Sequence, residues 1–405
     1  MKTRWNVAIP TPIRDTALFD AVGLPRFWAT IWALYALGHA AEATKRKRLG
    51  YVELLYQFSD ALRGPGALDD ALSGLDIARL GEILEAYFVS IRNRPVVSES
   101  SENKWQTAFT FVHETVLRLA KSDQPIDRLR IIEMRLNRLG LLYQQLHISK
   151  KRSHDTLRAL PATVVEALYE MLDPAAPHNP FRGNRSRWRA FVTFVVLLHQ
   201  GLRRGELLIL PADAVKHAVD NRRGTERYWI SIAPNTYQAQ DTRYSTPSIK
   251  TEHSIRQIPV SQLTARIIQE YVENHRGKPE HSFLMSSQYG RALSAESVTK
   301  MFQTISDSLP ASVLKDLSDR TGKRSISAHD FRHTCAVVRL NQLLTDGDSM
   351  DEALQKMRSF FGWSRSSDMP RKYARAVFED RLASVWNNVF DDRVAILRAV
   401  PAHIK

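Results

Sequence analysis

The sequence predicts a mainly α-helical protein of two domains, with a small antiparallel β-sheet in the second domain. Three observations lead to this fold class. Apolar residues recur at helical spacing through 27–148, a polar and basic stretch follows at 149–153, and two short strand patterns then stand among further helices. At 405 residues the chain is also longer than one ordinary domain. We therefore expect an irregular N-terminal arm at 1–25, a helical domain at 26–150 and an α+β domain at 155–405.

The N-terminal domain is expected to be a bundle of four or five helices. Three prolines among the first 25 residues, without clear periodicity around them, mark the preceding arm as irregular. From Phe27 onward, apolar and aromatic side chains recur every three or four positions, which is the spacing of one helix face. Trp28, Trp32 and Trp105 are expected in the core of this bundle. One helix is expected from Phe27 to the basic run at 45–48, and the other expected helical segments are 49–62, 77–91, 105–120 and 126–146.

The second domain is expected to combine helices with two short strands. β-Branched and aromatic residues give strand patterns at 228–232 and 256–260, and the polar stretch 233–250 joins them. An amphipathic segment at about 378–398 is expected to be helical. Two roles are possible for this helix, docking on a neighbouring copy of the chain or packing on its own domain. The other expected helices are 161–172, 191–198, 262–275, 293–307, 329–343 and 351–361.

The composition favours a polyanionic partner. Lys and Arg number 57 against 43 Asp and Glu, which gives a net charge of +14. Nucleic acid is the first candidate and an acidic membrane surface the second. The single cysteine, Cys335, excludes an internal disulfide and a cysteine-based zinc finger. The first charged residues lack a following apolar region, and the apolar run 29–38 is about half of the ~20 residues that span a bilayer. We expect a soluble, cytoplasmic protein without a signal peptide.

Two groups of basic residues are candidate DNA contacts. One follows the first expected helix and the other precedes the apolar run 191–198. Each group can instead be a solvated helix end or loop, since cations are favoured near helix C-termini. The net charge of the chain favours contact with phosphates. The candidates are Lys45, Arg46, Lys47, Arg48, Arg182, Arg185 and Arg187.

Two segments of the second domain place a cation beside a turn. In the first, Arg203 and Glu206 are three residues apart after Gly201, so the carboxylate can hold the guanidinium in place. In the second, Lys250 stands in the turn before the strand 256–260. Taken singly, the first can be a surface ion pair at a helix start and the second a solvated lysine.

Two later segments complete the set of candidate groups. His329 and Arg332 share one face of a helix that Ser327 is expected to cap, by accepting a backbone N–H. Cys335 belongs to the apolar face of that helix and is expected in its core. Trp363 follows a glycine, and ten residues later Tyr373 stands among cations. A phenol in a cationic setting suits a nucleophile that attacks a phosphate, although a surface aromatic is the ordinary alternative.

The order of these segments carries a family resemblance. Gly-Leu-Arg-x-x-Glu-Leu, then Lys-Thr-x-x-Ser-x-Arg-x-Ile-Pro, then His-Asp-Phe-Arg-His-Thr, then Gly-Trp and a late Tyr follow one another in this chain. Over about 155–380 the sequence resembles the tyrosine recombinase (phage integrase) family. The preceding helical bundle resembles, by helix content, the core-binding domain with which that family clamps DNA. One departure is the interval from Trp363 to Tyr373, which is one residue longer than usual.

The resemblance implies a role for each matching residue. Arg203 and Arg332 would clamp the scissile phosphate, and Lys250 would protonate the departing 5′ oxygen. His329 would act as general acid/base or hydrogen-bond donor, and Trp363 as a donor. Tyr373 would attack the phosphorus and form a 3′-phosphotyrosine link. Glu206 would support Arg203, and His333 would pack behind the site. Because the covalent link conserves the phosphodiester energy and cations neutralise the phosphate, neither ATP nor a metal ion is implied, and no cofactor is expected.

The resemblance leads us to expect a site-specific recombinase that acts on double-stranded DNA. The expected roles are integration or excision of a mobile element, or resolution. A homotetramer on two sites, accessory DNA-bending or directionality proteins and a nucleoid location belong to this expectation. The alternatives are a type IB-like topoisomerase, a telomere resolvase, or a non-catalytic DNA-binding protein on the same fold. All of the catalytic positions are filled in this sequence, which disfavours the last alternative.

Overall fold

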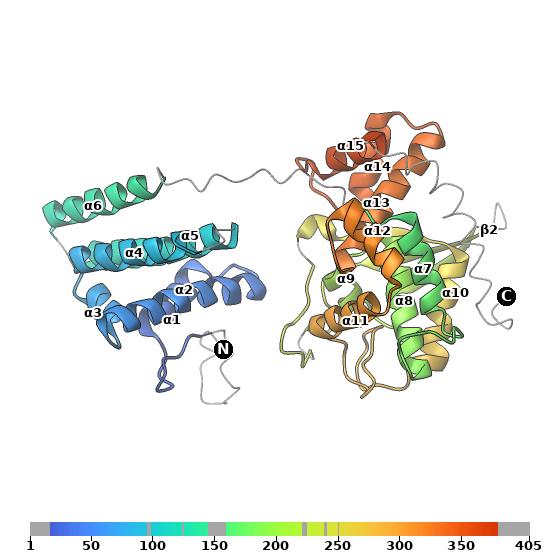
Figure 1. The fold of residues 1–405 in the computed structure, drawn as a ribbon, viewed down its shortest axis with the longest axis horizontal. Coiled ribbons are helices and arrows are strands. Elements are labelled where there is room, and N and C mark those ends of the chain that lie inside the picture. Colours follow the sequence, from blue (N-terminus) through green and yellow to red (C-terminus); the bar gives the residue numbers. More distant parts are fainter. Residues whose placement is uncertain are drawn as a thin grey trace. The chain divides into compact units, whose positions relative to one another are not determined.

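Helices dominate both parts of the chain in the computed structural model, and a single small sheet accompanies them among the described residues (Figure 1). The fold class predicted from the sequence is therefore confirmed. By internal contacts the chain divides into two units, Met1–Ser153 and His154–Lys405. The residues that the structure describes are 17–94, 99–123, 125–144, 159–220, 225–238, 241–249 and 251–379.

The first unit is a helical bundle around a buried aromatic cluster. Trp32 packs edge-on against Phe111 with ring centroids 5.4 Å apart, and Tyr56 lies 6.0 Å from the same ring. All three side chains are almost fully buried, so this cluster joins the first, second and fifth helices. The helices are α1 (Phe27–Ala36), α2 (Glu42–Arg63), α3 (Ala67–Ser73), α4 (Ile77–Arg92), α5 (Glu99–Asp123) and α6 (Ile126–Gln144).

The basic run of this unit does not lie where the sequence suggested. We expected residues 45–48 to follow the first helix as its C-terminal end, but they lie in the first two turns of α2. The helix dipole favours acidic rather than basic groups near that end, so it does not explain the run. Within the run, Arg46 pairs with Glu42 at 2.8 Å, whereas Lys47 and Arg48 are exposed.

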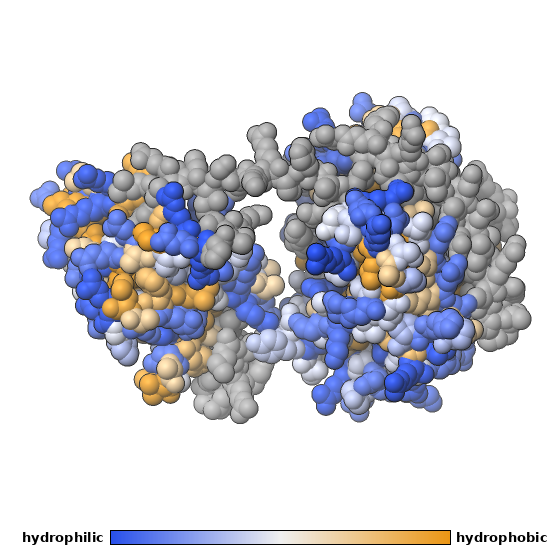
Figure 2. Space-filling model, viewed as in Figure 1, coloured by the Kyte–Doolittle hydropathy of each residue, from blue (hydrophilic) through white to orange (hydrophobic). Residues whose placement is uncertain are grey.

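The first unit also exposes apolar side chains, which Figure 2 shows as orange patches on its visible face. On α6, Ile132 and Leu136 are buried, while Ile126 and Met134 are 72% and 64% exposed. In the second unit the exposed large apolar side chains among the described residues are scattered along the chain. An uncovered apolar helix face is therefore a property of the first unit.

The second unit surrounds one buried helix with other helices and a three-stranded sheet. Its strands pair antiparallel in the order β1-β2-β3, with Val215 opposite Ile230 and Ile230 opposite Ile258. The strands are β1 (Val215–Asp220), β2 (Thr225–Ile232) and β3 (Arg256–Val260). The helices are α7 (Ala162–Leu172), α8 (Asn184–Gln200), α9 (Arg204–Ile209), α10 (Gln262–Glu270), α11 (Ala295–Asp307), α12 (Ala311–Thr321), α13 (Ala328–Thr345), α14 (Met350–Phe361) and α15 (Met369–Glu379).

Helix α8 is the centre of this unit. Every residue from Ala190 to Gln200 is buried, because α7, α10 and α13 all pack against it. A helix that is apolar on all sides is expected only where neighbours cover all of its faces. On α13, Thr334 accepts a hydrogen bond from the Leu160 backbone N–H at 2.8 Å, which fixes the segment before α7. Cys335 lies in the core of α13, as expected.

Some elements differ from the sequence-based expectation. Helices α3 and α12 and strand β1 were not expected, and α10 passes into a π-helical turn at Tyr271–His275. The expected helix at 378–398 lies, from residue 380 onward, outside the described residues, as do residues 1–16 of the arm. None of the helices that the structure describes is both long and apolar enough to cross a membrane.

A buried histidine in α8 makes stability depend on pH. The ring of His199 is hydrogen-bonded to the Tyr169 hydroxyl at 2.6 Å, and burial, together with the nearby charge of Arg339, lowers the pKa of His199 to about 3. The unfolded chain binds a proton at this position below about pH 6.5, whereas the folded chain does not until about pH 3. The contribution of His199 to the free energy of unfolding is therefore fully present above pH 6.5 and is lost as the pH decreases toward 3.

We expect His199→Gln to make the free energy of unfolding less dependent on pH below 6.5. Glutamine keeps a polar group for the Tyr169 hydroxyl but does not titrate. The free energy of unfolding is measured by denaturant titration between pH 4 and 8 for wild type, His199→Gln and, as control, His178→Gln in an exposed loop. An acid dependence as steep in His199→Gln as in wild type would contradict the assignment.

Candidate active site

Three arginines from different elements converge on one buried carboxylate. Glu206, in the first turn of α9, accepts a hydrogen bond at 2.6 Å from the guanidinium of Arg203. Arg256 of β3 donates to both carboxylate oxygens, at 3.2 and 3.0 Å. Arg332 of α13 lies 3.9 Å from Glu206 Oε2. Positions 203, 256 and 332, which are far apart in the sequence, thus share one counter-ion, and we call this group the arginine network.

The charge state of Glu206 follows from its surroundings. Burial alone would raise the pKa of this carboxyl. The hydrogen bond and charge of Arg256, the charge of Arg332 and the backbone N–H of Arg203 outweigh burial, so the pKa of Glu206 is lowered. The carboxylate is therefore ionised at neutral pH and holds the three guanidinium groups in fixed positions.

Exposure differs among the three arginines. The side chain of Arg203 is 23% exposed, whereas those of Arg256 and Arg332 are 6% and 3% exposed. Arg203 also donates to the Ser254 hydroxyl at 3.0 Å, which orients its guanidinium. An anion that approaches the network from solvent therefore meets Arg203 first.

Arg332 is fixed by two helix ends. Its guanidinium donates to the Gly201 carbonyl at the end of α8 and to the Phe361 carbonyl at the end of α14, both at 2.6 Å. Burial and the charge of Arg203 lower the pKa of Arg332 to about 9, so it remains charged at neutral pH. Gly201 has a positive φ of 57°, and a Cβ there would meet the Phe361 ring at 2.4 Å. Glycine at this position lets α8 approach α14 closely enough for Arg332 to bridge them.

A second glycine positions the aromatic part of the site. Gly362 ends α14 with a positive φ of 59°, and a Cβ there would lie 2.9 Å from the His253 carbonyl oxygen. The chain then turns so that Trp363 stacks on Phe361, with ring centroids 4.7 Å apart and planes 14° from parallel. Tyr373 stacks on Trp363 in turn, at 5.4 Å and 13°. The longer interval between Trp363 and Tyr373 is thus compatible with direct contact between the two rings.

The Tyr373 hydroxyl is buried against α13. Tyr373 is only 5% exposed, and its hydroxyl is hydrogen-bonded to His333 Nδ1. His333, which we expected to pack behind the site, therefore contacts the candidate nucleophile directly. His329, the histidine expected to be catalytic, is exposed and meets His333 edge-on, with ring centroids 4.3 Å apart.

The start of α13 is fixed by a carboxylate. Ser327 is the N-cap residue as expected and forms a capping box with Asp330, and its hydroxyl also donates to Asp330 Oδ2 at 2.8 Å. The same oxygen accepts the Ser327 backbone N–H at 2.8 Å, and Lys323 pairs with Asp330. This arrangement fixes the turn that presents His329, Arg332 and His333.

The structure brings together most of the residues selected from the sequence. Arg203, Glu206 and Arg332 belong to the arginine network, and Trp363 and Tyr373 form one stack beside it. The phenol of Tyr373 is near enough to influence the pKa of Arg332. Lys250 lies outside the described residues, so its predicted role stays a prediction.

Two residues of the site were not predicted from the sequence. They are Arg256, which belongs to the arginine network, and Ser254, which accepts a hydrogen bond from Arg203. Arg256 ties Glu206 to the Phe360 carbonyl, which its Nε–H contacts at 2.7 Å. The sequence did contain a signal for Arg256. This arginine stands in a strand with buried apolar residues, and a charge in such a strand needs a buried anion as its partner.

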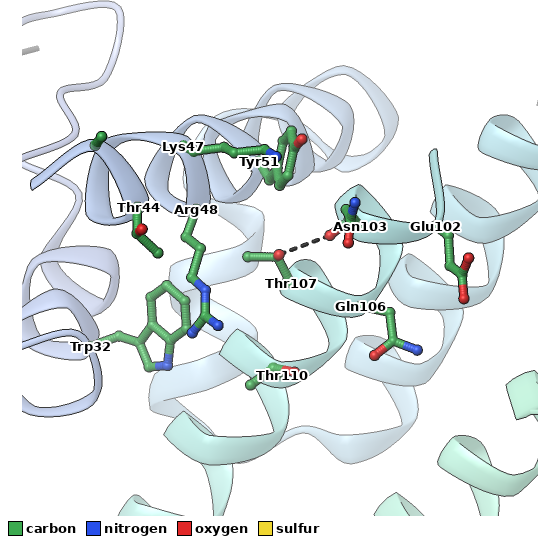
Figure 3. Close-up of a pocket in the computed structure, with 11 residues that line it drawn as sticks. Trp32, Thr44, Lys47, Arg48, Tyr51, Glu102, Asn103, Gln106, Thr107 and Thr110 are labelled. Atoms are coloured by element: carbon green, nitrogen blue, oxygen red, sulfur yellow. Dashed lines mark hydrogen bonds between the residues drawn. The ribbon is translucent and has the colours of Figure 1, made fainter. Parts of the chain in front are cut away.

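Two of the four residues in the basic run, Lys47 and Arg48, border a cleft of about 690 Å³ between α2 and α5, whereas Lys45 and Arg46 do not line it. In Figure 3, Arg48 of α2 and Thr107 of α5 point into the space between these helices, and the guanidinium of Arg48 lies beside Trp32. Lys47 lies beside Tyr51, 5.8 Å from the ring centroid. The residues that line the cleft are Trp32, Ala43, Thr44, Lys47, Arg48, Tyr51, Glu102, Asn103, Gln106, Thr107 and Thr110.

The basic residues near α8 have different environments. Arg182 and Arg185 are exposed. Arg187 is half-buried and donates to three backbone carbonyls, of Phe181 at 2.8 Å, Pro174 at 3.1 Å and Ala176 at 3.4 Å. These bonds fix the loop before α8, so Arg187 has a structural function and is not a good candidate for DNA contact.

Comparison with known proteins identifies one family. The family model described as "Phage integrase family" matches residues 158–379, which is more than half of the chain. No curated protein matches the sequence. The matched region contains the arginine network, Trp363 and Tyr373, whereas the cleft between α2 and α5 lies outside it.

The arginine network predicts a large effect of one carboxylate on stability. Glu206→Gln removes the shared counter-ion and leaves the buried charges of Arg256 and Arg332 uncompensated. Breaking a buried pair in this way costs about 3–5 kcal/mol. We expect a loss of this size in the free energy of unfolding by denaturant titration. The control Glu280→Gln, at an exposed position, should change little, and equal stabilities of the two variants would contradict this role of Glu206.

Proposed function

The chain belongs to the phage integrase family of tyrosine recombinases, and we propose that it is a site-specific recombinase that cleaves and rejoins DNA through a 3′-phosphotyrosine intermediate. One observation carries the proposal. Tyr373, a phenol on a late helix, stacks on Trp363 at 5.4 Å, and the guanidinium of Arg332 lies 5.7 Å from the centroid of the Trp363 ring. Arg332 shares the counter-ion Glu206 with the partly exposed Arg203. This arrangement supports a role for Tyr373 as the nucleophile and for the two arginines as the groups that bind the phosphate.

The proposed reaction uses this arrangement in one step. The Tyr373 hydroxyl oxygen attacks the phosphorus while the bond to the 5′ oxygen breaks. Negative charge develops on the non-bridging oxygens, and fixed guanidinium groups stabilise it because they need no reorganisation during the reaction. Arg203 and Arg332 are the groups we assign to this task. Lys250 supplies the proton to the departing oxygen in this proposal, as the family resemblance implies, and His329 and Trp363 are assigned to hydrogen bonding at the phosphate.

The cleft between α2 and α5 supports contact with DNA by the first unit. Lys47 and Arg48 are exposed cations on one side, suited to phosphates. Asn103 and Gln106, on the other side, are exposed amides that can pair with the edge of adenine. Groups for phosphate contact and for base reading in one cleft favour a site-specific enzyme over a topoisomerase that needs no defined sequence.

The remaining parts of the proposal follow from site-specific recombination. Exchange between two sites needs four nucleophiles, so we propose a homotetramer in synapsis. Accessory DNA-bending or directionality proteins, a mobile-element role and a cytoplasmic location at the nucleoid complete the proposal. The amphipathic segment 378–398 keeps both of its predicted roles, docking on a neighbouring copy of the chain or packing on its own domain.

Tyr373→Phe should abolish the covalent protein–DNA adduct and leave DNA binding unchanged, because only the attacking oxygen is removed. The substrate is a nicked duplex made from the DNA that flanks the gene, and the adduct is detected by denaturing electrophoresis. Tyr289→Phe, at a residue that is 81% exposed, is the control and should form the adduct normally. An adduct that persists in Tyr373→Phe would refute the assignment of the nucleophile.

The two sides of the cleft should affect DNA binding differently. Arg48→Ala should weaken binding to all sequences and lower the slope of log K against log salt by about 0.9, the value for one phosphate. Gln106→Ala should instead change the preference between sites, with about 1–3 kcal/mol of discrimination lost at one base pair. Both are measured by fluorescence anisotropy on a panel of duplexes.

Lys121→Ala is the matched control for the cleft. Lys121 is an exposed cation on the same helix as Gln106, about 20 Å further along α5. Its removal should leave both the salt slope and the site preference unchanged. Equal effects of Lys121→Ala and Arg48→Ala would mean that the cleft has no special part in binding.

A further inference from the structure

The side chain of Tyr373 is held by two contacts, one to its ring and one to its hydroxyl. One face of the ring is stacked on Trp363, and the hydroxyl is hydrogen-bonded to His333 Nδ1. His333 is itself only 6% exposed and lies on α13 directly after Arg332. Because α15 packs on both α13 and α14, these contacts join the late helix to the arginine network. The direction in which the hydroxyl oxygen points is therefore set by His333.

The chemistry at this hydroxyl requires a proton acceptor. A phenol has an ordinary pKa of about 10, so at neutral pH it must lose a proton as it attacks. The indole of Trp363 and the guanidinium of Arg332 are donors without a free lone pair. An imidazole can accept a proton at neutral pH, and His333 presents Nδ1 to the hydroxyl.

The second histidine of this region is placed differently. His329 is exposed and touches the edge of the His333 ring rather than lying on the ring stack. It can thus face a substrate from solvent, whereas His333 faces the nucleophile from the protein interior. The two histidines lie one helical turn apart on α13. His333 contacts Tyr373, and His329 is available to a substrate.

We propose that His333 orients the Tyr373 hydroxyl and accepts its proton during attack. The inference rests on the proposed function. In the forward step the Tyr373 O–H bond breaks, Nδ1–H forms, the phenol oxygen bonds to phosphorus, and the 5′ oxygen leaves with a proton from the general acid assigned to Lys250. In rejoining, the 5′ hydroxyl attacks, its proton returns to that acid, and the departing phenol oxygen recovers its proton from His333. Protons and bonds therefore balance over one cycle.

The decisive comparison is between two substitutions of His333. Asparagine places a polar group near the position of Nδ1 and keeps a partner for the hydroxyl, but it does not accept a proton at neutral pH. Leucine removes both properties. We expect His333→Asn to bind DNA as wild type does and to form the covalent adduct about 10²–10⁴-fold more slowly, the usual contribution of a general base. His333→Leu should be at least as slow, and His178→Asn, at an exposed loop position, should match wild type.

Two chemical substitutions separate proton acceptance from a structural role. A trifluorotyrosine at position 373 ionises more readily, so it should restore much of the rate in His333→Asn. A 5′-bridging phosphorothiolate substrate, whose sulfur leaves without a proton, should not restore His333→Asn but should restore Lys250→Ala. Recovery of His333→Asn on the sulfur substrate, or no effect of fluorination, would overturn the proposal.

The outcomes also separate this inference from the proposed function. If wild-type protein forms no adduct on any nicked substrate, the proposed function fails. If wild type forms the adduct and His333→Asn forms it equally fast, the recombinase assignment stands and the role of His333 is refuted.

Discussion

The buried carboxylate of Glu206 is the interaction on which the second unit depends. Without it, Arg203, Arg256 and Arg332 would repel one another in a place from which water is largely excluded. With it, α9, β3 and α13 share one fixed point, and the pKa of Glu206 stays low despite its burial. A buried ion pair adds little net stability compared with an apolar core, but it is costly to break. The carboxylate therefore specifies an arrangement more than it strengthens the fold.

Close backbone approach is the second constraint. Arg332 bridges two carbonyls that end different helices, at Gly201 and Phe361. That bridge requires α8 and α14 to meet, and the Gly201 position has no room for a Cβ. Gly362 gives the chain a sharp turn toward Trp363 and Tyr373. The two glycines in the sequence motifs thus explain why the cationic and aromatic halves of the site lie together.

The sequence predicted these features unequally, for physical reasons. Helix α8 was recognisable because burial on all sides leaves an uninterrupted apolar run. Helix α3 has only seven residues, while α12 buries only Leu317 and Thr321 and β1 is exposed from residue 216 to 219, so these elements carry little apolar pattern. The strand around Arg256 indicated that this arginine needs a buried anion, but the local sequence could not show which one, because its partner Glu206 is 50 residues away in the chain. Spacing likewise grouped His329 with Arg332, but it could not show which histidine of α13 would meet a tyrosine forty residues later.

The electrostatics of the arginine network suit a transition state better than a ground state. Three guanidinium groups against one carboxylate leave two positive charges, and burial, with the charge of Arg203, lowers the pKa of Arg332 to about 9. A phosphodiester brings one negative charge, so it balances this excess only in part. In the proposed reaction, the pentacoordinate phosphorane carries more negative charge on the same oxygens. The arginine network therefore stabilises the phosphorane more than it stabilises the bound phosphodiester. This difference lowers the activation free energy of the reaction, whereas equal stabilisation of both would only tighten substrate binding.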